Sequence, residues 1–166
     1  MKTLRSLVIV VFLGVGAGFG WVSAQEFGNT ESGHLTAQDY ADIQQLFWRY
    51  NQGSDFRDAD LFLSAFADDA VFRTGPGQEY VGREELAALR VERHAGQSGD
   101  NGRRHWNSSY RITPSDQGAT GLIYWLLVDV STSPPNLVVS GYYEDVYVKT
   151  TVGWRIKTRT IKRDVG

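Results

Sequence analysis

The stretch Phe47-Trp48-Arg49-Tyr50-Asn51-Gln52-Gly53-Ser54-Asp55 closes the first amphipathic segment of the chain. A glycine just past a helix end lets the backbone turn in the left-handed conformation, so we expect Gly53 to end this helix. If the helix continued, Asp55 would lie about 140° around the axis from Tyr50. A turn at Gly53 would bring both side chains to the same opening of the apolar interior. Two titratable groups at the rim of an apolar interior could form an acid–base site, which the remaining chain is expected to enclose.

The residues before this stretch have the pattern of a helix start. Thr36 and Asp39 are spaced as in a capping box, with Asp in place of Glu. The apolar positions that follow recur at helical spacing. They form one stripe that we expect to pack in the core: Tyr40, Ile43, Leu46, Phe47 and Tyr50.

The next segment predicts two further helices around a hairpin. Residues 58–66 have the apolar pattern of a short second helix, and Asp68 and Asp69 are expected to end it. A strand begins at 70–72, residues 75–77 form a Gly-Pro-Gly turn, and 79–81 returns as the partner strand. The third helix is predicted from Gly82 to about His94, with acids in its first turn as the helix dipole favours.

After a Gly-rich loop at 96–102 the apolar period changes to two, which indicates a sheet. Strands are predicted over 104–112, 119–130, 137–149 and 154–162. The second is almost wholly apolar, as expected of a strand covered on both faces. In the fourth, a β-bulge near 157–158 would turn Arg159 inward together with Ile161. Helices followed by long antiparallel strands predict an α+β fold with a curved sheet wrapped on the helices.

Strand alternation assigns faces to the first long strand. One face is expected to carry His105, Asn107, Ser109 and Arg111. The other face is expected to carry Trp106, Ser108, Tyr110 and Ile112.

Composition indicates one domain and excludes several classes of site. The 166 residues are 42% hydrophobic and 13% aromatic, ample for one core with a lined cavity. The chain has no cysteine, so it contains no disulfide and no thiolate site. We also expect no metal site, because no two histidines fall at ligand spacing.

Residues 1–24 have the features of an export signal. Lys2 and Arg5 precede an apolar run, and 22–24 (Val-Ser-Ala) fits a cleavage site before Gln25. An uncleaved anchor is the alternative, but glycines interrupt a run that is short for a membrane span. Residues 25–35 are expected to be a flexible leader, 36–166 the domain, and the location periplasmic or secreted. Removal of Lys2 and Arg5 leaves 15 basic and 19 acidic residues, a net charge of −4 that argues against nucleic-acid binding.

Several ordered motifs resemble a known family. They are Leu46–Tyr50 with Asp55, 68–72 (DDAVF), 80–83 (YVGR), His105 with Ser109, 141–145 (GYYED), and 153–156 (GWRI) with Arg159. Together they resemble the SnoaL-like branch of the cone-shaped nuclear transport factor 2-like fold, over nearly all of the mature chain. That family includes scytalone dehydratase, bile-acid 7α-dehydratase and hexachlorocyclohexane dehydrochlorinase, which are cofactor-free lyases.

The resemblance implies roles for particular residues. In the lyases a strand histidine pairs with an aspartate after the first helix, positions that match His105 and Asp55. Tyr50 and Arg159 would line the same pocket. Ser109 departs from the asparagine that family members often carry, and Trp106 crowds the segment after the histidine. The resemblance also implies a small hydrophobic substrate, no cofactor and a homodimer.

The chemistry of these residue types suits β-elimination. An imidazole with a carboxylate on its other nitrogen is a good base near neutral pH. Tyr50 could donate a proton to a leaving oxygen, and Arg159 could stabilise developing negative charge. Asp129 alone interrupts the apolar second strand and could face the cavity.

Each residue also has a structural interpretation. His105 could be hydrogen-bonded within the sheet, Asp55 could cap the second helix, Tyr50 could be a core tyrosine, and Arg159 could pair with Asp145.

Two function classes follow. The first is a cofactor-independent lyase or isomerase acting on a small hydrophobic cyclic compound, with His105 and Asp55 as the base pair. The second is a binding module for an apolar molecule, or a domain that dimerises through its open sheet face.

Overall fold

The computed structural model describes residues 33–164. The predicted export signal and the leader up to residue 32 lie outside the described residues. Within 33–164, no helix is both long enough and apolar enough to cross a membrane.

Helix α1 (Ala37–Asp55) begins as predicted and ends later than predicted. The Thr36 and Asp39 side chains form the expected capping box, and Ile43, Leu46 and Tyr50 are buried on the predicted stripe. The expectation that Gly53 ends the helix is wrong, because the helix continues through Gly53 to Asp55.

The physical role of Gly53 is close packing. A Cβ atom at this position would lie 2.4 Å from the backbone nitrogen of Phe62, which belongs to helix α2 (Ala59–Leu63). The missing side chain therefore allows α2 to pack directly on the last turn of α1.

The second helix is shorter than predicted because the chain enters the sheet early. Asp58 caps α2 through a hydrogen bond from the Leu61 amide, and strand β1 (Phe66–Gly75) begins only three residues after the helix. Phe66 pairs with Ile156, so Asp68 and Asp69 lie within β1 and do not end a helix. Strand β2 (Gln78–Val81) and helix α3 (Gly82–His94) follow as predicted.

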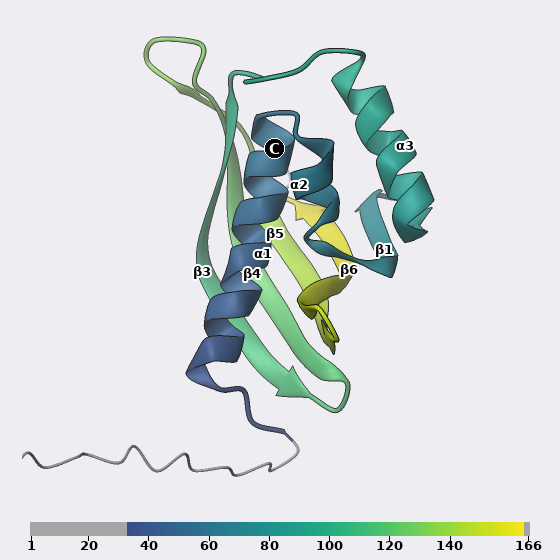
Figure 1. Ribbon diagram of the computed structural model, residues 1–166. Coiled ribbons are helices and arrows are strands. Elements are labelled where there is room, and N and C mark those ends of the chain that lie inside the picture. Colours follow the sequence, from purple (N-terminus) through teal and green to yellow (C-terminus); the bar gives the residue numbers. More distant parts are fainter. Residues whose placement is uncertain (1–32, 165–166) are drawn as a thin grey trace, which may run out of the picture.

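The four remaining strands complete one six-stranded sheet in the order β2-β1-β6-β5-β4-β3. They are β3 (Arg103–Ser115), β4 (Gly118–Asp129), β5 (Asn136–Thr150) and β6 (Gly153–Arg163). Only β1 and β6 pair in parallel; the other neighbours are antiparallel. Helix α1 crosses the sheet in front of β3, β4 and β5, and α3 lies beside β1 (Figure 1). The predicted α+β architecture is confirmed.

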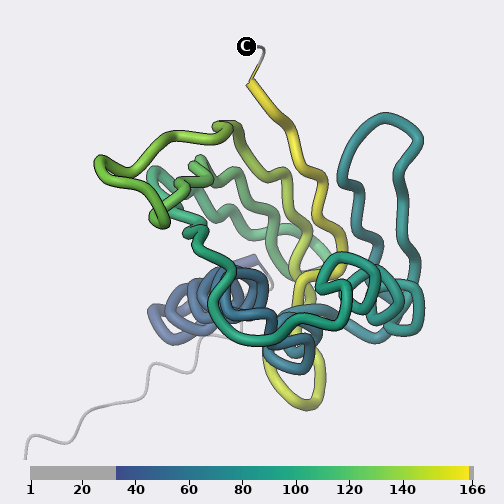
Figure 2. The backbone as a smooth tube through the Cα atoms, turned by 90° about the horizontal axis from the view of Figure 1, so that it is seen from above, coloured from purple at the N-terminus to yellow at the C-terminus, as the bar shows by residue number. Residues whose placement is uncertain are grey.

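The helices cover one face of the curved sheet (Figure 2). The expectation that β4 is covered on both faces is therefore wrong. Its outward residues Tyr124 and Leu126 are 53% and 39% exposed, whereas Ile123 and Trp125 on the inner face are buried.

Two irregularities decide which side chains point inward. On β6 the predicted bulge is confirmed, because Val146 pairs with Thr158 whereas the next residue, Tyr147, pairs with Ile156. On β3 a second bulge, at Ser109 with φ 47°, was not predicted.

The bulge on β3 changes the phase of that strand. Past the bulge, Tyr110 contacts the ring of Phe47 on α1, and Ile112 packs against the core. Tyr110 and Ile112 therefore lie on the same face as His105, and the assignment of Ser109 and Arg111 to that face is wrong. Strict alternation fails here because the bulge adds a residue on one strand.

Candidate functional site

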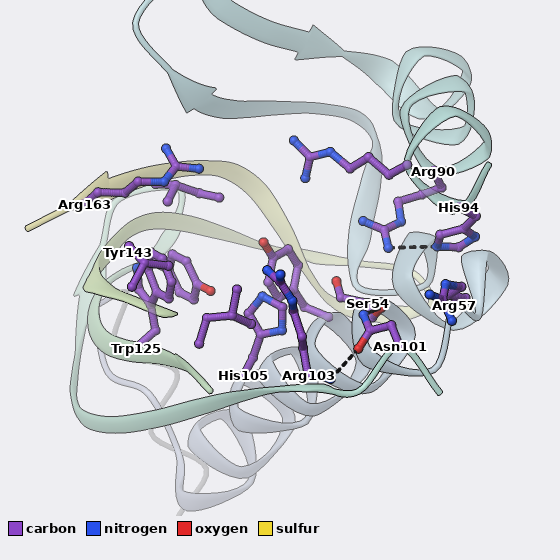
Figure 3. A pocket seen from close by; sticks show the side chains of 15 residues that line it. Ser54, Arg57, Arg90, His94, Asn101, Arg103, His105, Trp125, Tyr143 and Arg163 are labelled. Carbon is purple, nitrogen blue, oxygen red and sulfur yellow. Dashed lines mark hydrogen bonds between the residues drawn. The ribbon is translucent and has the colours of Figure 1, made fainter. Parts of the chain in front are cut away.

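A cavity of about 490 Å³ lies between the helices and the inner face of the sheet. Its lining comes from α1, α3, the loop before β3, and strands β3 to β6. Figure 3 shows Trp125 and Tyr143 on one side, Arg90, His94 and Arg57 on the other, and His105 between them. The complete lining is Tyr50, Ser54, Arg57, Arg90, Arg93, His94, Asn101, Arg103, His105, Trp125, Leu127, Val139, Tyr143, Ile161 and Arg163.

His105 is held by both oxygens of one carboxylate. Its Nδ1 lies 2.6 Å from Oδ1 of Asp55, and its backbone amide donates to Oδ2 at 3.0 Å. An ionised carboxylate only accepts hydrogen bonds, so a neutral imidazole in this arrangement would carry its proton on Nδ1 and leave Nε2 as the basic nitrogen. The Asp55 side chain is 5% exposed and that of His105 is 16% exposed, and of the two only His105 lines the cavity.

The loop before β3 brings these two residues together. The Asn101 amide donates to the Asp55 carbonyl at 2.9 Å, and its side chain donates to the Ser54 carbonyl at 3.0 Å. These bonds attach the loop to the last turn of α1, so β3 begins beside the helix end. Asn51, one turn earlier, donates to the His105 carbonyl at 3.2 Å. Asp55 thus reaches His105 from within the helix, without the turn that we expected at Gly53.

Tyr50 lies at the boundary between core and cavity. It is 3% exposed, lines the cavity, and its ring centroid is 6.0 Å from that of His105. It also contacts the ring of Tyr143 at 5.6 Å. Burial raises the pKa of the Tyr143 phenol well above its usual range, and the neighbouring Tyr50 raises it further. Tyr143 is therefore a neutral hydroxyl group in this wall.

Comparison with known proteins identifies the family of the chain. Residues 35–160 match the family model of the SnoaL-like domain. The chain belongs to the SnoaL-like family. Membership supports a catalytic or ligand-binding role for the chain. A comparison with curated proteins gives no match.

Solved structures share the fold. A protein of unknown function with a cystatin-like fold from Nostoc punctiforme is 27% identical, with 79% of this chain and 95% of that chain covered and a TM-score of 0.69. A Catenulispora acidiphila protein in complex with S-DNPA is 24% identical, with 78% and 96% covered and a TM-score of 0.66. A Novosphingobium aromaticivorans protein provisionally named scytalone dehydratase is 20% identical, with 77% and 85% covered and a TM-score of 0.63.

Arg159 of this SnoaL-like domain does not line the cavity. It is fully buried, and its guanidinium donates to both oxygens of Asp145 at 2.9 Å and 2.6 Å. It lies 4.3 Å from the ring centroids of both Tyr50 and Tyr143. The expected substrate-binding role is therefore corrected: Arg159 pairs with Asp145, which was the alternative, and it supports the two tyrosines from behind.

Three other expected substrate contacts also lie outside the cavity. Asp129 accepts hydrogen bonds from Ser131 at the β4 end, and Ser109 is exposed on the β3 bulge. Trp106 is 55% exposed because it points to the side of the sheet opposite His105. The substrate-binding assignments of Asp129, Ser109 and Trp106 are corrected accordingly.

The arginines of the cavity wall were not predicted from the sequence. Arg90 is buried on α3, one helical turn after Leu86 and next to Leu89, which are also buried. A charged residue on an apolar helical stripe was a signal that could have identified it. Arg163, near the end of β6, is exposed at the cavity mouth. Among residues 33–164, no cluster of three His, Asp or Glu side chains is arranged to hold a metal ion.

Proposed function

We propose that this SnoaL-like domain is a cofactor-independent lyase of the dehydratase type, or an isomerase, that acts on a small cyclic compound with a largely hydrophobic body. The observation that carries the proposal is the hydrogen bond between His105 Nδ1 and Asp55 at 2.6 Å beside a cavity of about 490 Å³. The provisional name of the Novosphingobium protein is consistent with it.

The first chemical step is proton abstraction. His105 Nε2 removes a proton from a carbon next to a carbonyl group, and Asp55 stabilises the imidazolium that forms. The C–H electron pair forms the double bond as a hydroxyl group leaves the neighbouring carbon. Tyr50 donates its phenolic proton to this hydroxyl, so water is released. Return of the proton from His105 to Tyr50 restores both groups.

The same base serves an isomerase. In that reaction the proton held by His105 returns to another carbon of the substrate, and no group leaves. The wall beside His105 is apolar, because the Trp125 ring centroid lies 6.5 Å from that of the imidazole and Leu127 pairs with His105 across β3 and β4.

A panel of cyclic β-hydroxy ketones tests the proposal. We expect turnover with loss of one water for a dehydratase, or exchange of a carbon-bound proton for solvent deuterium for an isomerase, both followed by mass spectrometry. His105→Gln and Asp55→Asn should each lower the rate by about 10²- to 10⁴-fold. The matched control is Asp42→Asn on the outer part of α1, which should not change the rate. Wild-type turnover by His105→Gln would refute the assignment.

The second candidate function is a binding or dimerisation module. The exposed apolar outer face of the sheet, with Trp106, Tyr124 and Leu126, favours it. Binding of the panel without turnover or deuterium exchange would support this alternative over the lyase.

A further inference from the structure

The cavity is lined by an unusual number of cations. Five of its residues are arginines, and among the residues that the structure describes no Asp or Glu contributes to the lining. Arg93, Arg103 and Arg163 are exposed at the mouth, and Arg57 is half-buried. Arg90 lies deeper and is only 4% exposed. A site that binds only neutral hydrocarbon has no need of this charge.

Arg90 has no carboxylate partner in the described part of the chain. Its Nη2 lies 2.9 Å from Nε2 of His94, its guanidinium carbon lies 4.4 Å from the Phe62 ring centroid, and its Nε has no hydrogen-bond partner there. Burial lowers the pKa of Arg90, whereas Asp55 raises it only through space. The guanidinium still stays charged at neutral pH, because an arginine side chain gives up its proton only in strongly basic solution. A buried charge without a counter-ion is costly.

Arg159 provides the internal comparison. It is as deeply buried as Arg90, but both oxygens of Asp145 neutralise its charge. The fold therefore supplies a carboxylate where a buried arginine is structural. Arg90 instead points into the cavity in Figure 3, where a ligand could supply one.

The neighbours of Arg90 hold it without neutralising it. Burial, Arg90 and Arg57 together lower the pKa of His94, so His94 is neutral and accepts a hydrogen bond from Arg90. Arg57 has a left-handed backbone with φ 54°, and its Nη1 donates to the carbonyls of Gly99 and Asp100. A non-glycine residue in this conformation is strained, and such strain concentrates at functional sites.

The opposite wall is aromatic and apolar. Trp125 and Tyr143 are stacked, with ring centroids 5.4 Å apart and an interplanar angle of 6°. Leu127, Val139 and Ile161 extend this surface. The cavity therefore has one wall for a ring and one wall for an anion, with His105 between them (Figure 3).

We propose that the ligand of this cavity is a ring compound bearing a carboxylate, with the carboxylate bound by Arg90 and the ring placed against Trp125 and Tyr143. A carboxylate is planar and singly charged, which matches one buried guanidinium. The mouth arginines attract the anion from solution. This inference rests on the proposed function for placing the substrate in the cavity, but it does not depend on the reaction carried out there.

Equilibrium binding of matched naphthalene probes tests the inference. By titration calorimetry, naphthalene-2-carboxylate should bind the wild-type protein at least about tenfold more tightly than its neutral isostere 2-naphthamide. Arg90→Gln should weaken carboxylate binding by about tenfold or more and leave amide binding unchanged. Arg73→Gln, on the distant β1–β2 hairpin where Arg73 pairs with Glu79, is the matched control and should change neither affinity.

Several results would overturn the inference. They are equal affinities for carboxylate and amide, an unchanged affinity in Arg90→Gln, and no carboxylate binding up to about 10 mM. Tighter binding of 2-naphthyl phosphate would overturn the carboxylate assignment. If Arg90→Gln does not fold, the exposed double variant Arg103→Gln/Arg163→Gln must reduce both the carboxylate affinity and its salt dependence.

The reaction is tested separately. His105→Gln should lower turnover by about 10²- to 10⁴-fold and retain carboxylate binding. Loss of the anion preference would therefore refute this inference, whereas retained turnover in His105→Gln would refute only the proposed function.

Discussion

Gly53 shows how one missing side chain positions the catalytic candidates. It lies inside α1, where alanine would normally be the better helix former. The backbone of Phe62 fills the space that a Cβ atom would need. Close packing of α2 on this turn fixes the end of α1, which carries Tyr50 and Asp55.

Gly53→Ala should therefore destabilise the domain despite its favourable helix propensity. We expect a loss of about 1–3 kcal/mol in the free energy of unfolding, because the new methyl group forces α1 and α2 apart. Urea denaturation measures it. Gln52→Ala, an exposed substitution in the same turn, is the control and should be neutral or slightly stabilising. A stabilised Gly53→Ala variant would contradict the packing role.

The predicted contact between His105 and Asp55 is present, and the catalytic role of the pair stays a prediction. Residue-level prediction failed where packing decided. His105, Asp55 and Tyr50 were identified by their chemistry and by the family resemblance, and the structure brings them together. Gly53 was misinterpreted because a glycine near a helix end looks the same whether it turns the chain or admits a neighbour. The pairing of Arg159 with Asp145 was only the alternative interpretation, and no sequence pattern indicates that Arg90 is left without a carboxylate.

At the level of elements, Asp39 joins the start of α1 to the sheet. Its carboxylate accepts hydrogen bonds from Thr36, from Lys149 at 2.7 Å on β5 and from the indole of Trp154 at 2.8 Å on β6. Burial by itself would raise the pKa of Asp39, but the bonds from Lys149, Thr36 and Trp154 outweigh burial and hold the pKa far below its usual range.

This lowered pKa predicts a pH dependence of stability. A carboxyl group whose pKa is lower in the folded state stabilises the protein above its unfolded pKa, and that contribution is lost as the pH falls. Thermal unfolding should show that the wild type loses stability below about pH 5 more steeply than Asp39→Asn does. Parallel pH profiles for the two proteins would show that Asp39 does not link α1 to the sheet.

The ion pair between β5 and β6 predicts a large cost for removing one partner. Asp145→Asn leaves the Arg159 guanidinium buried without its counter-ion, so we expect a loss of about 3–5 kcal/mol. The control is Glu144→Gln on the same strand, because Glu144 pairs with Lys162 at 3.5 Å on the surface. That change should cost no more than about 1 kcal/mol. Comparable losses in the two variants would contradict the buried pair.

Elements with strong local signals were predicted well. The capping box, α3, the β1–β2 hairpin and the β6 bulge all follow from residue patterns. The start of β1 was missed because Phe66 joins the sheet through pairing with distant Ile156. The β3 bulge was missed because Ser109 carries no turn signature in the sequence.

At the level of the whole molecule, the sheet has an uncovered apolar face. Trp106 and Leu126 are paired across β3 and β4, and Ser108 pairs with Tyr124 beside them. Residues that pair directly in this way point to the same face. Such a face can be covered by the same face of a second copy related by a two-fold axis.

We therefore expect a homodimer through this outer face. Light scattering at about 10 μM protein should give twice the chain mass for the wild type and the monomer mass for Leu126→Glu. Val152→Glu, at the exposed β5–β6 turn, should remain dimeric. A monomeric wild type would contradict the expectation.

Export by residues 1–24 also stays a prediction.

The measurement that bears most directly on the catalytic assignment is the tautomer of His105, read from long-range ¹H–¹⁵N correlations of the imidazole near neutral pH. If Asp55 positions His105 as a base, the proton lies on Nδ1 and Nε2 is unprotonated in the wild type, and Asp55→Asn loses this preference. A proton on Nε2 in the wild type would contradict the account, because His105 would then present no base to the cavity.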